Sequence, residues 1–136
     1  MRDDKCIFCK IAAGEIPSAT LYEDKDFRVI MDVSPASKGH ALILPKEHYA
    51  NLYELDDELA AKVLVLAKKM ITKLKDIVGC DGYNVLQNNG TAAGQTVFHF
   101  HMHLIPRYEN DNVNIGWEPG SRSDDVKEMV LSGMAE

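Results

Sequence analysis

Polar and apolar residues alternate most regularly over residues 99–105, where His99, His101 and His103 take every second position. Successive side chains of a strand point to opposite faces, so a strand here carries the imidazoles on one face and apolar side chains on the other. In a helix, steps of two residues would turn the second ring to the far side. Further strand-forming segments, each bounded by turn residues, lie at residues 20–23, 27–32, 40–45 and 83–87.

A longer apolar period predicts one long helix that begins after Asp56 and ends at Gly79. The side chains expected on its buried face recur every three or four residues and are Leu59, Val63, Leu66, Met70, Leu74 and Ile77. Short helices are expected over residues 7–13 and from residue 123 onward. Strands on both sides of a long helix indicate an α+β domain with a mainly antiparallel five-stranded sheet. We expect the long helix to cover one sheet face and the histidines to lie on the other, or on its rim.

Length and charge restrict the classes of function. A chain of 136 residues, 46% hydrophobic and 26% charged, suits one soluble domain. The net charge of −6 argues against a nucleic-acid polymer as partner but allows one nucleotide in a local pocket. The apolar stretches are too short for a membrane span, and residues 1–5 are unlike a signal peptide. With three cysteines and no secretory signal, we expect a cytoplasmic protein without a membrane partner.

The histidine stripe allows two chemistries. Alternate imidazoles can ligate one metal ion, or one neutral imidazole can act as a nucleophile while its neighbours orient it and bind anions. The loop over residues 88–96 is small and polar, and its Gly90 and Gly94 let backbone N–H groups approach an anion. Next to the stripe, this loop favours nucleophilic chemistry on a phosphate.

The run Cys6-Ile7-Phe8-Cys9 is a second candidate site. Such a pair can be a redox couple, half of a zinc site, or neither. A thioredoxin-type pair follows a strand within a βαβ pattern, which this N-terminal segment lacks. Zinc needs two further ligands, for which Cys80 and the remaining histidines are candidates.

The run from His99 to Ile105 resembles the signature of the histidine triad family of nucleotide hydrolases and transferases. Residues 31–35, 39–46 and 94–97 support the resemblance, which covers about residues 5–107 of a single domain and leaves 108–136 as a C-terminal extension. It implies an antiparallel α+β protomer and attack of an imidazole on an α-phosphate. It also implies a homodimer in which the strand over residues 83–88 and the long helix lie near a two-fold axis.

The resemblance assigns roles to individual residues. His101 would be the nucleophile that forms a nucleotidyl-imidazole intermediate, His103 would bind the phosphate, and His40 would orient the nucleophile or hold its tautomer. Asp32 would accept hydrogen bonds from the ribose hydroxyls. The residues placed near the phosphate are Asn88, Gly94, Gln95 and Thr96. The apolar slot for the base would be formed by Ile7, Phe8, Ile11, Ile30, Val33 and Leu42.

The resemblance extends to bacterial-type members in which the cysteine pair binds zinc together with two histidines. The four positions that correspond here are Cys6, Cys9, His48 and His99. Four protein ligands leave no open coordination position, so this zinc would be structural and would pin the N-terminal segment to the sheet. Cys80 is then expected to be a buried small apolar residue.

Only a few positions indicate which substrate branch of the family the chain resembles. Asp32 and Asn88 resemble the nucleoside phosphoramidase branch, whereas Gln95-Thr96 and the run 105–107 also resemble the dinucleoside polyphosphate hydrolases. Our leading expectation is a hydrolase of purine nucleoside 5′-phosphoramidates or adenylyl conjugates that releases AMP or GMP. Cleavage of dinucleoside polyphosphates is the alternative within catalysis. A nucleotide-binding interaction module with little catalysis is the alternative outside it.

Overall fold

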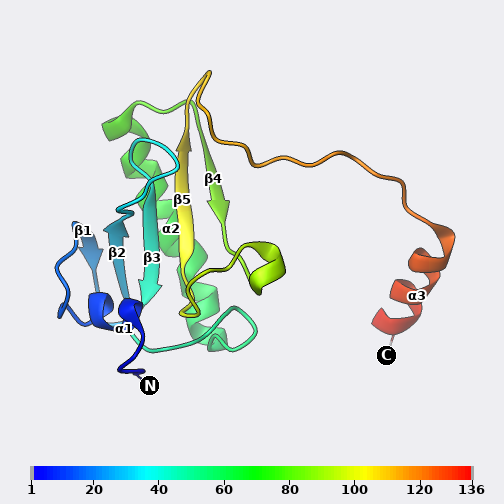
Figure 1. The fold of residues 1–136 in the computed structure, drawn as a ribbon, viewed down its shortest axis with the longest axis horizontal. Coiled ribbons are helices and arrows are strands. Elements are labelled where there is room, and N and C mark those ends of the chain that lie inside the picture. Colours follow the sequence, from blue (N-terminus) through cyan, green and yellow to red (C-terminus); the bar gives the residue numbers. More distant parts are fainter. Residues whose placement is uncertain (1, 136) are drawn as a thin grey trace.

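The computed structural model describes residues 2–135. Five strands form one antiparallel sheet, as predicted, and their order is β1-β2-β3-β5-β4 (Figure 1). The strands are β1 (Thr20–Glu23), β2 (Phe27–Met31), β3 (Ala41–Pro45), β4 (Gly82–Leu86) and β5 (Met102–Arg107). The predicted α+β class, with one long helix and short terminal helices, is confirmed.

The long helix α2 (Asp57–Val78) begins and ends where its capping residues predict. The Asp56 carboxylate accepts hydrogen bonds from two backbone N–H groups of the first turn, and Gly79 adopts the left-handed conformation that ends the helix. The predicted face packs on the core from Leu59, which is partly buried, as far as Leu74. The prediction for Ile77 is wrong, because its side chain is 71% exposed. The apolar period continues for one more turn, but the burial of α2 stops at Leu74.

The two faces of the sheet carry separate apolar clusters. On the α2 side, Phe100, Met102 and Leu104 belong to the main core. On the other side, a smaller cluster of β2 and β3 side chains packs against helix α1 (Ile7–Ala12). The regular pairing of β5 starts only at Met102, later than predicted, yet the alternation holds through residues 99–104. The histidines therefore lie under α1, on the face that α2 does not cover.

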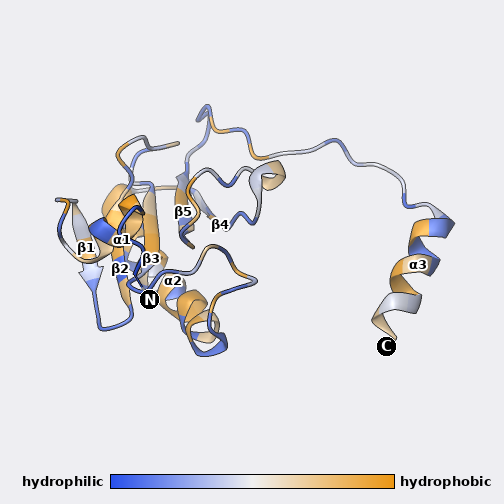
Figure 2. Ribbon diagram, turned by 60° about the horizontal axis from the view of Figure 1, so that its bottom comes forward, coloured by the Kyte–Doolittle hydropathy of each residue, from blue (hydrophilic) through white to orange (hydrophobic). Residues whose placement is uncertain are grey.

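The C-terminal extension leaves the sheet after β5. It runs without helix or strand to α3 (Asp124–Met134), which begins where the sequence predicts, is capped by Ser123 and has no buried residue. Figure 1 and Figure 2 both place α3 well apart from the rest of the chain. Within the described residues, no helix has the length and apolar character needed to cross a membrane.

Candidate functional site

The register of the sheet brings the candidate residues into neighbouring rows. Ile30 pairs with Leu42, Leu42 with His103, and His103 with Leu86, so these four side chains form one row across four strands. Continuing the β4–β5 register by two residues places Asn88 opposite His101. The apolar slot, the histidines and the start of the predicted phosphate loop are therefore adjacent, although they come from four separate parts of the chain.

The hydrogen bond of His101 defines which of its nitrogens carries the proton. Its Nδ1 lies 2.8 Å from the carbonyl oxygen of His99, and a carbonyl can only accept. Nδ1 is therefore the protonated nitrogen of the neutral ring, and Nε2 keeps its lone pair. The ring of Phe8 packs edge-on against His101, with 5.0 Å between the ring centroids. His101 is thus held as a neutral imidazole with a free nucleophilic nitrogen.

A second set of hydrogen bonds defines the tautomers of His40 and His103. The backbone N–H of Ala36 donates to His40 Nδ1 at 2.9 Å, so the proton of the neutral His40 ring is on Nε2. His40 Nε2 lies 2.9 Å from His103 Nδ1 and 3.6 Å from a carboxylate oxygen of Asp32. The shorter contact makes His103 Nδ1 an acceptor, which leaves the N–H of His103 at Nε2. His40 therefore contacts His103. The resemblance implied instead that His40 would orient the nucleophile, His101.

Burial keeps these rings neutral. It lowers the pKa of His101 and His40 below the ordinary value, against the opposing effect of the Asp32 carboxylate. Burial, together with the neighbouring His101 and His40, lowers the pKa of His103 to about 4. At neutral pH the site therefore offers one nitrogen lone pair, on His101, and an N–H donor on the adjacent His103, whose ring centroid is 5.0 Å away.

The loop that follows β4 is shaped by Gln95. The side-chain oxygen of Gln95 accepts from the N–H of Gly90, and its amide nitrogen donates to the carbonyls of Ala50 and Val97. Gln95 is buried and its amide is fully used inside the protein. The loop includes the short 3₁₀ helix η1 (Thr91–Ala93), which ends at Gly94 with φ 96°. A Cβ at Gly94 would lie 3.6 Å from the Asn88 side chain, so the loop folds back onto Asn88.

The residues predicted to hold the base come together only in part. Phe8 and Ile11 of α1 pack against Ile30 and Leu42, which makes a continuous apolar surface beside His101. At the edge of this surface, Ile7 is 52% exposed. Val33 is 96% exposed and therefore packs against little of the chain. Thr96 is also exposed, and it lines a hollow that includes Cys6 and Ile7.

The four predicted zinc ligands lie around one point. One ligand atom from each of Cys6, Cys9, His48 and His99 lies within 4.8 Å of the other three. Cys9 Sγ is 3.3 Å from His48 Nδ1 and 3.4 Å from His99 Nδ1, and Cys6 Sγ is 3.5 Å from His99 Nδ1. Usual Zn–S and Zn–N lengths put the sulfur–nitrogen edge of a tetrahedron at about 3.5 Å. The donor set and its spacing therefore fit a tetrahedral zinc ion.

The surroundings of this cluster support the same fit. His99 Nε2 donates to the carbonyl oxygen of Pro45 at 2.9 Å, which leaves Nδ1 as the nitrogen that faces the sulfurs. Burial raises the pKa of the Cys9 thiol and lowers the pKa of His99 to about 4. Burial favours the protonated form of a thiol, but a divalent cation reverses this preference because it stabilises the thiolate directly.

The structure also defines the surroundings of Cys80 and Arg107. Cys80 is partly exposed rather than buried, because it follows the helix-ending Gly79, beyond the buried part of α2. Arg107 binds Asp111 through Nε and Nη2, Asn84 through Nη1, and the carbonyl of Val113 through Nη2. Its guanidinium is thus committed to the start of the C-terminal extension.

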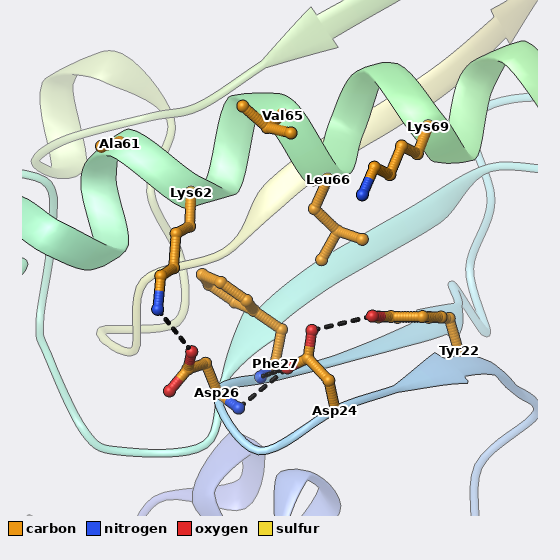
Figure 3. Close-up of a pocket in the computed structure, with 9 residues that line it drawn as sticks. All are labelled: Tyr22, Asp24, Asp26, Phe27, Ala61, Lys62, Val65, Leu66 and Lys69. Carbon is orange, nitrogen blue, oxygen red and sulfur yellow. Dashed lines mark hydrogen bonds and ion pairs between the residues drawn. The ribbon is translucent and has the colours of Figure 1, made fainter.

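A groove on the α2 side of the sheet is unrelated to the histidines (Figure 3). It lies between the β1–β2 turn and α2. Its acidic groups are already bonded, because Asp26 pairs with Lys62, and Asp24 accepts from Tyr22 and from backbone N–H groups. The groove therefore offers no free reactive group comparable with those under α1.

Sequence reasoning missed the partners that set the tautomers. They are the backbone N–H of Ala36 and the carbonyls of Pro45 and His99, and backbone groups leave no signature in side-chain identity. The structural use of Gln95 was missed for a related reason, since its partners are backbone groups as well. The only sequence signal was its place between the glycine-rich loop and the stripe.

Comparisons with known proteins agree with this geometry. Residues 13–110 match the HIT domain family. A protein named hit from Bacillus subtilis is 46% identical over 133 residues, which are 97% of this chain and 90% of that protein. An adenosine 5′-monophosphoramidase of Schizosaccharomyces pombe is 49% identical over 113 residues, which are 82% of each chain.

The similarity to solved structures includes the C-terminal extension. A crystal structure of a HIT family member from Bacillus subtilis has a TM-score of 0.88 at 41% identity, over 97% of this chain and 96% of that one. Because so little of the chain stays unmatched, this alignment runs into α3. A zinc-bound histidine triad protein of Mycobacterium smegmatis has a TM-score of 0.76 at 31% identity, over 96% of this chain and 93% of that one. By its sequence, its fold and its histidine stripe, the chain belongs to the HIT domain family.

Proposed function

We propose that this HIT-family hydrolase cleaves purine nucleoside 5′-phosphoramidates, or related adenylyl conjugates, at the α-phosphate and releases AMP or GMP. The observation that carries the proposal is the hydrogen bond from His101 Nδ1 to the His99 carbonyl. It leaves Nε2 unprotonated beside an N–H donor of His103. A neutral nucleophile next to a donor for phosphate oxygens is the pair that this reaction requires.

The reaction would take place in two displacements. His101 Nε2 attacks the phosphorus, the bond from phosphorus to the amine nitrogen breaks, and the amine leaves with that electron pair and gains a proton. The His99 carbonyl, which accepts from Nδ1–H, stabilises the positive charge that develops on the His101 ring. Water then attacks the same phosphorus, its proton passes to solvent, and His101 is released as the neutral imidazole.

The remaining residues would bind the nucleotide. One Asp32 oxygen accepts from the Ser34 N–H, which leaves capacity on the carboxylate for the ribose hydroxyls. The apolar surface of Phe8, Ile11, Ile30 and Leu42 would hold the base. Asn88 lies next to Gly94, and the β4–β5 register extended by two residues would bring it opposite His101, so the phosphate would rest between this loop and His103.

Arg107 favours the phosphoramidate over a dinucleoside polyphosphate. Additional phosphates need cations, and Arg107 is the arginine closest in sequence to the histidine stripe. Its guanidinium is already held by Asp111, Asn84 and Val113. Using it for substrate would require breaking the contacts that fix the start of the extension. We therefore place dinucleoside polyphosphates second.

A comparison of specificity constants tests this choice. We expect kcat/KM for an adenosine 5′-phosphoramidate to exceed the values for diadenosine tri- and tetraphosphate by about tenfold or more, which is about 1.4 kcal/mol in transition-state binding. An Arg107→Lys variant is the matched control and should lower all three values alike. A preference for the polyphosphates, lost selectively in Arg107→Lys, would refute the assignment. Nucleotide binding without turnover of any of the three would instead indicate an interaction module.

We also infer that zinc is bound by Cys6, Cys9, His48 and His99, and that it is structural. With four protein ligands the ion has no open position for substrate. When bound, it would tie α1 to the loop after β3 and to the segment before β5, and so would hold Phe8 against His101. We further expect a homodimer, since β4 is an edge of the sheet and presents an open backbone ladder.

A further inference from the structure

The turn between β2 and β3 carries the group that sets the tautomer of His40, yet little of the turn itself is packed. The backbone N–H of Ala36 donates to His40 Nδ1 at 2.9 Å. Residues 33–36 are all exposed, so side-chain packing does not hold this N–H in place. A hydrogen bond to an imidazole nitrogen requires a defined distance and angle. Contacts made by the rest of the turn must therefore fix its position.

Ser37, the residue after Ala36, ties the turn to the end of β5. Its hydroxyl donates to the carbonyl oxygen of Pro106 at 2.6 Å, and its own carbonyl accepts from the N–H of His40 at 3.2 Å. Figure 1 shows the β2–β3 turn and the end of β5 at the same end of the sheet. Ser37 therefore fixes the segment between Ala36 and His40 relative to β5, the strand that carries His103.

Tyr108 makes a second tie to the same turn. Its hydroxyl donates to the carbonyl oxygen of Lys38 at 2.5 Å, and the Lys38 ammonium lies 5.3 Å from the centroid of the Tyr108 ring. The backbone N–H of Tyr108 donates to the Asp111 carboxylate, which also binds Arg107. Because Asp111 holds Tyr108 in place, the start of the C-terminal extension is a fixed anchor for the turn.

The close approach of Gly39 leaves the turn no room to shift toward the sheet. Gly39 has φ 94°, and a Cβ at this position would lie 2.8 Å from the Val78 side chain and 3.4 Å from that of Pro106. The turn thus lies directly against Pro106 and the end of α2. The hydrogen bonds of Ser37 and Lys38 oppose movement in the other direction.

These contacts connect the end of β5 to the ring of His103. We propose that Ser37 and Tyr108 are positioning residues, which hold the Ala36 N–H on His40 Nδ1 and thereby keep His103 protonated at Nε2. Without the Ala36 N–H, His40 can carry its proton on Nδ1. Its Nε2 then accepts from His103 Nδ1, and His103 Nε2 no longer carries a proton. The effect on catalysis rests on the proposed function, in which the N–H at His103 Nε2 binds the α-phosphate.

The protonation of the ring nitrogens tests the proposal without any substrate. The full-length protein with ¹⁵N-labelled histidine is compared with Ser37→Ala and Tyr108→Phe in long-range ¹H–¹⁵N spectra at neutral pH, which distinguish protonated from unprotonated ring nitrogens. In the parent protein we expect His40 and His103 to carry their protons on Nε2. Each variant should move a measurable fraction of both rings to the Nδ1–H form, and Ser37→Ala should move more because Ser37 adjoins Ala36. Unchanged protonation in both variants would overturn the proposal.

Kinetics of the same variants separate positioning from packing. Ser37→Ala should lower kcat for an adenosine 5′-phosphoramidate by about threefold to tenfold with little change in KM, the size expected for the loss of one hydrogen bond. Ser37→Thr keeps a hydroxyl and should recover most of kcat and the Nε2–H form of His103. Equal losses of kcat in both variants, with His103 still protonated at Nε2 in each, would contradict the proposal.

A matched control accompanies Tyr108→Phe. Tyr22→Phe also removes a phenol hydrogen bond, the one to Asp24 at the β1 edge of the sheet, and should change neither kcat nor the protonation of His103. A shift of the His103 proton in Tyr22→Phe as large as that in Tyr108→Phe would overturn the assignment of Tyr108. If the parent protein turns over no phosphoramidate, the proposed function fails, and the spectra alone still decide whether Ser37 and Tyr108 position His103.

Discussion

His99 and His101 are two residues apart on the same segment, yet their contacts prepare them for different chemistry. His99 donates from Nε2 to the Pro45 carbonyl and turns Nδ1 toward the sulfurs of Cys6 and Cys9. His101 donates from Nδ1 to the His99 carbonyl and keeps Nε2 free. In each ring, the protonated nitrogen donates a hydrogen bond to a backbone carbonyl. The groups around the other nitrogen then determine which chemistry that nitrogen can perform. These contacts thus favour metal ligation by His99 and nucleophilic attack by His101.

Removing the nucleophile should give the largest effect and should leave the metal cluster intact. We expect His101→Ala to lower kcat/KM for an adenosine 5′-phosphoramidate by about 10⁴-fold, close to 5.5 kcal/mol of transition-state stabilisation. Zinc content, measured on the same preparation, should stay at about one ion per chain. A His101→Ala enzyme with nearly normal turnover would remove the distinction between the two histidines.

Removing a ligand should have the opposite pattern. We expect Cys9→Ser to lose tightly bound zinc and to lower the free energy of unfolding by about 3 kcal/mol or more, because the four ligands connect distant segments. Cys80→Ser is the matched control, since Cys80 lies outside the cluster, and it should keep both zinc and stability. Activity of the folded fraction of Cys9→Ser should fall less than that of His101→Ala. Full stability and equal metal content in Cys9→Ser would contradict the inferred zinc site.

His40 sharpens the comparison, because its Nε2 contacts His103 and not His101. Loss of the donor to His103 Nδ1 frees the His103 ring to adopt the other tautomer. We expect His40→Ala to lower kcat by about tenfold to a hundredfold with little change in KM. His40→Gln can still donate to His103 and should recover much of this loss. Equal effects of Ala and Gln would point to a role of His40 in packing alone.

The smallest predicted effect is a shift in titration. Burial disfavours the charged form, so the folded pKa of His103 lies near 4, below its ordinary value of about 6.5. The contribution of His103 to stability is therefore complete above about pH 6.5 and is lost as the pH falls toward 4. An NMR titration of the His103 ring should give a midpoint well below 6. A midpoint at 6.5 or above would show a solvated or charge-stabilised ring.

Much of the fold was predictable because single side chains carry the signal. Asp56 and Gly79 mark the ends of α2, and the alternation around His99, His101 and His103 separates the two sheet faces. The grouping of the four cysteine and histidine ligands was available only through the resemblance. Their positions are far apart in sequence, and spacing alone left several partners open.

What escaped prediction depends on how far packing extends and on backbone groups. Ile77 keeps the helical period but lies past the last buried residue of α2, and periodicity does not report where a core ends. The contact of His40 with His103 depends on strand register and on the N–H of Ala36. The contacts of Arg107 also escaped prediction, because its partner Asp111 lies in the extension, outside the motif that carries the resemblance.

The central claim is that His101 Nε2 becomes covalently bonded to the α-phosphorus. Rapid mixing of the enzyme with an adenosine 5′-phosphoramidate, followed by quenching at alkaline pH and peptide mass spectrometry, tests it directly. We predict a burst of about one amine per chain and an added adenylyl group on the peptide that contains His101, both absent in His101→Ala. Turnover by the parent enzyme without a burst and without an adduct on His101 would contradict the account.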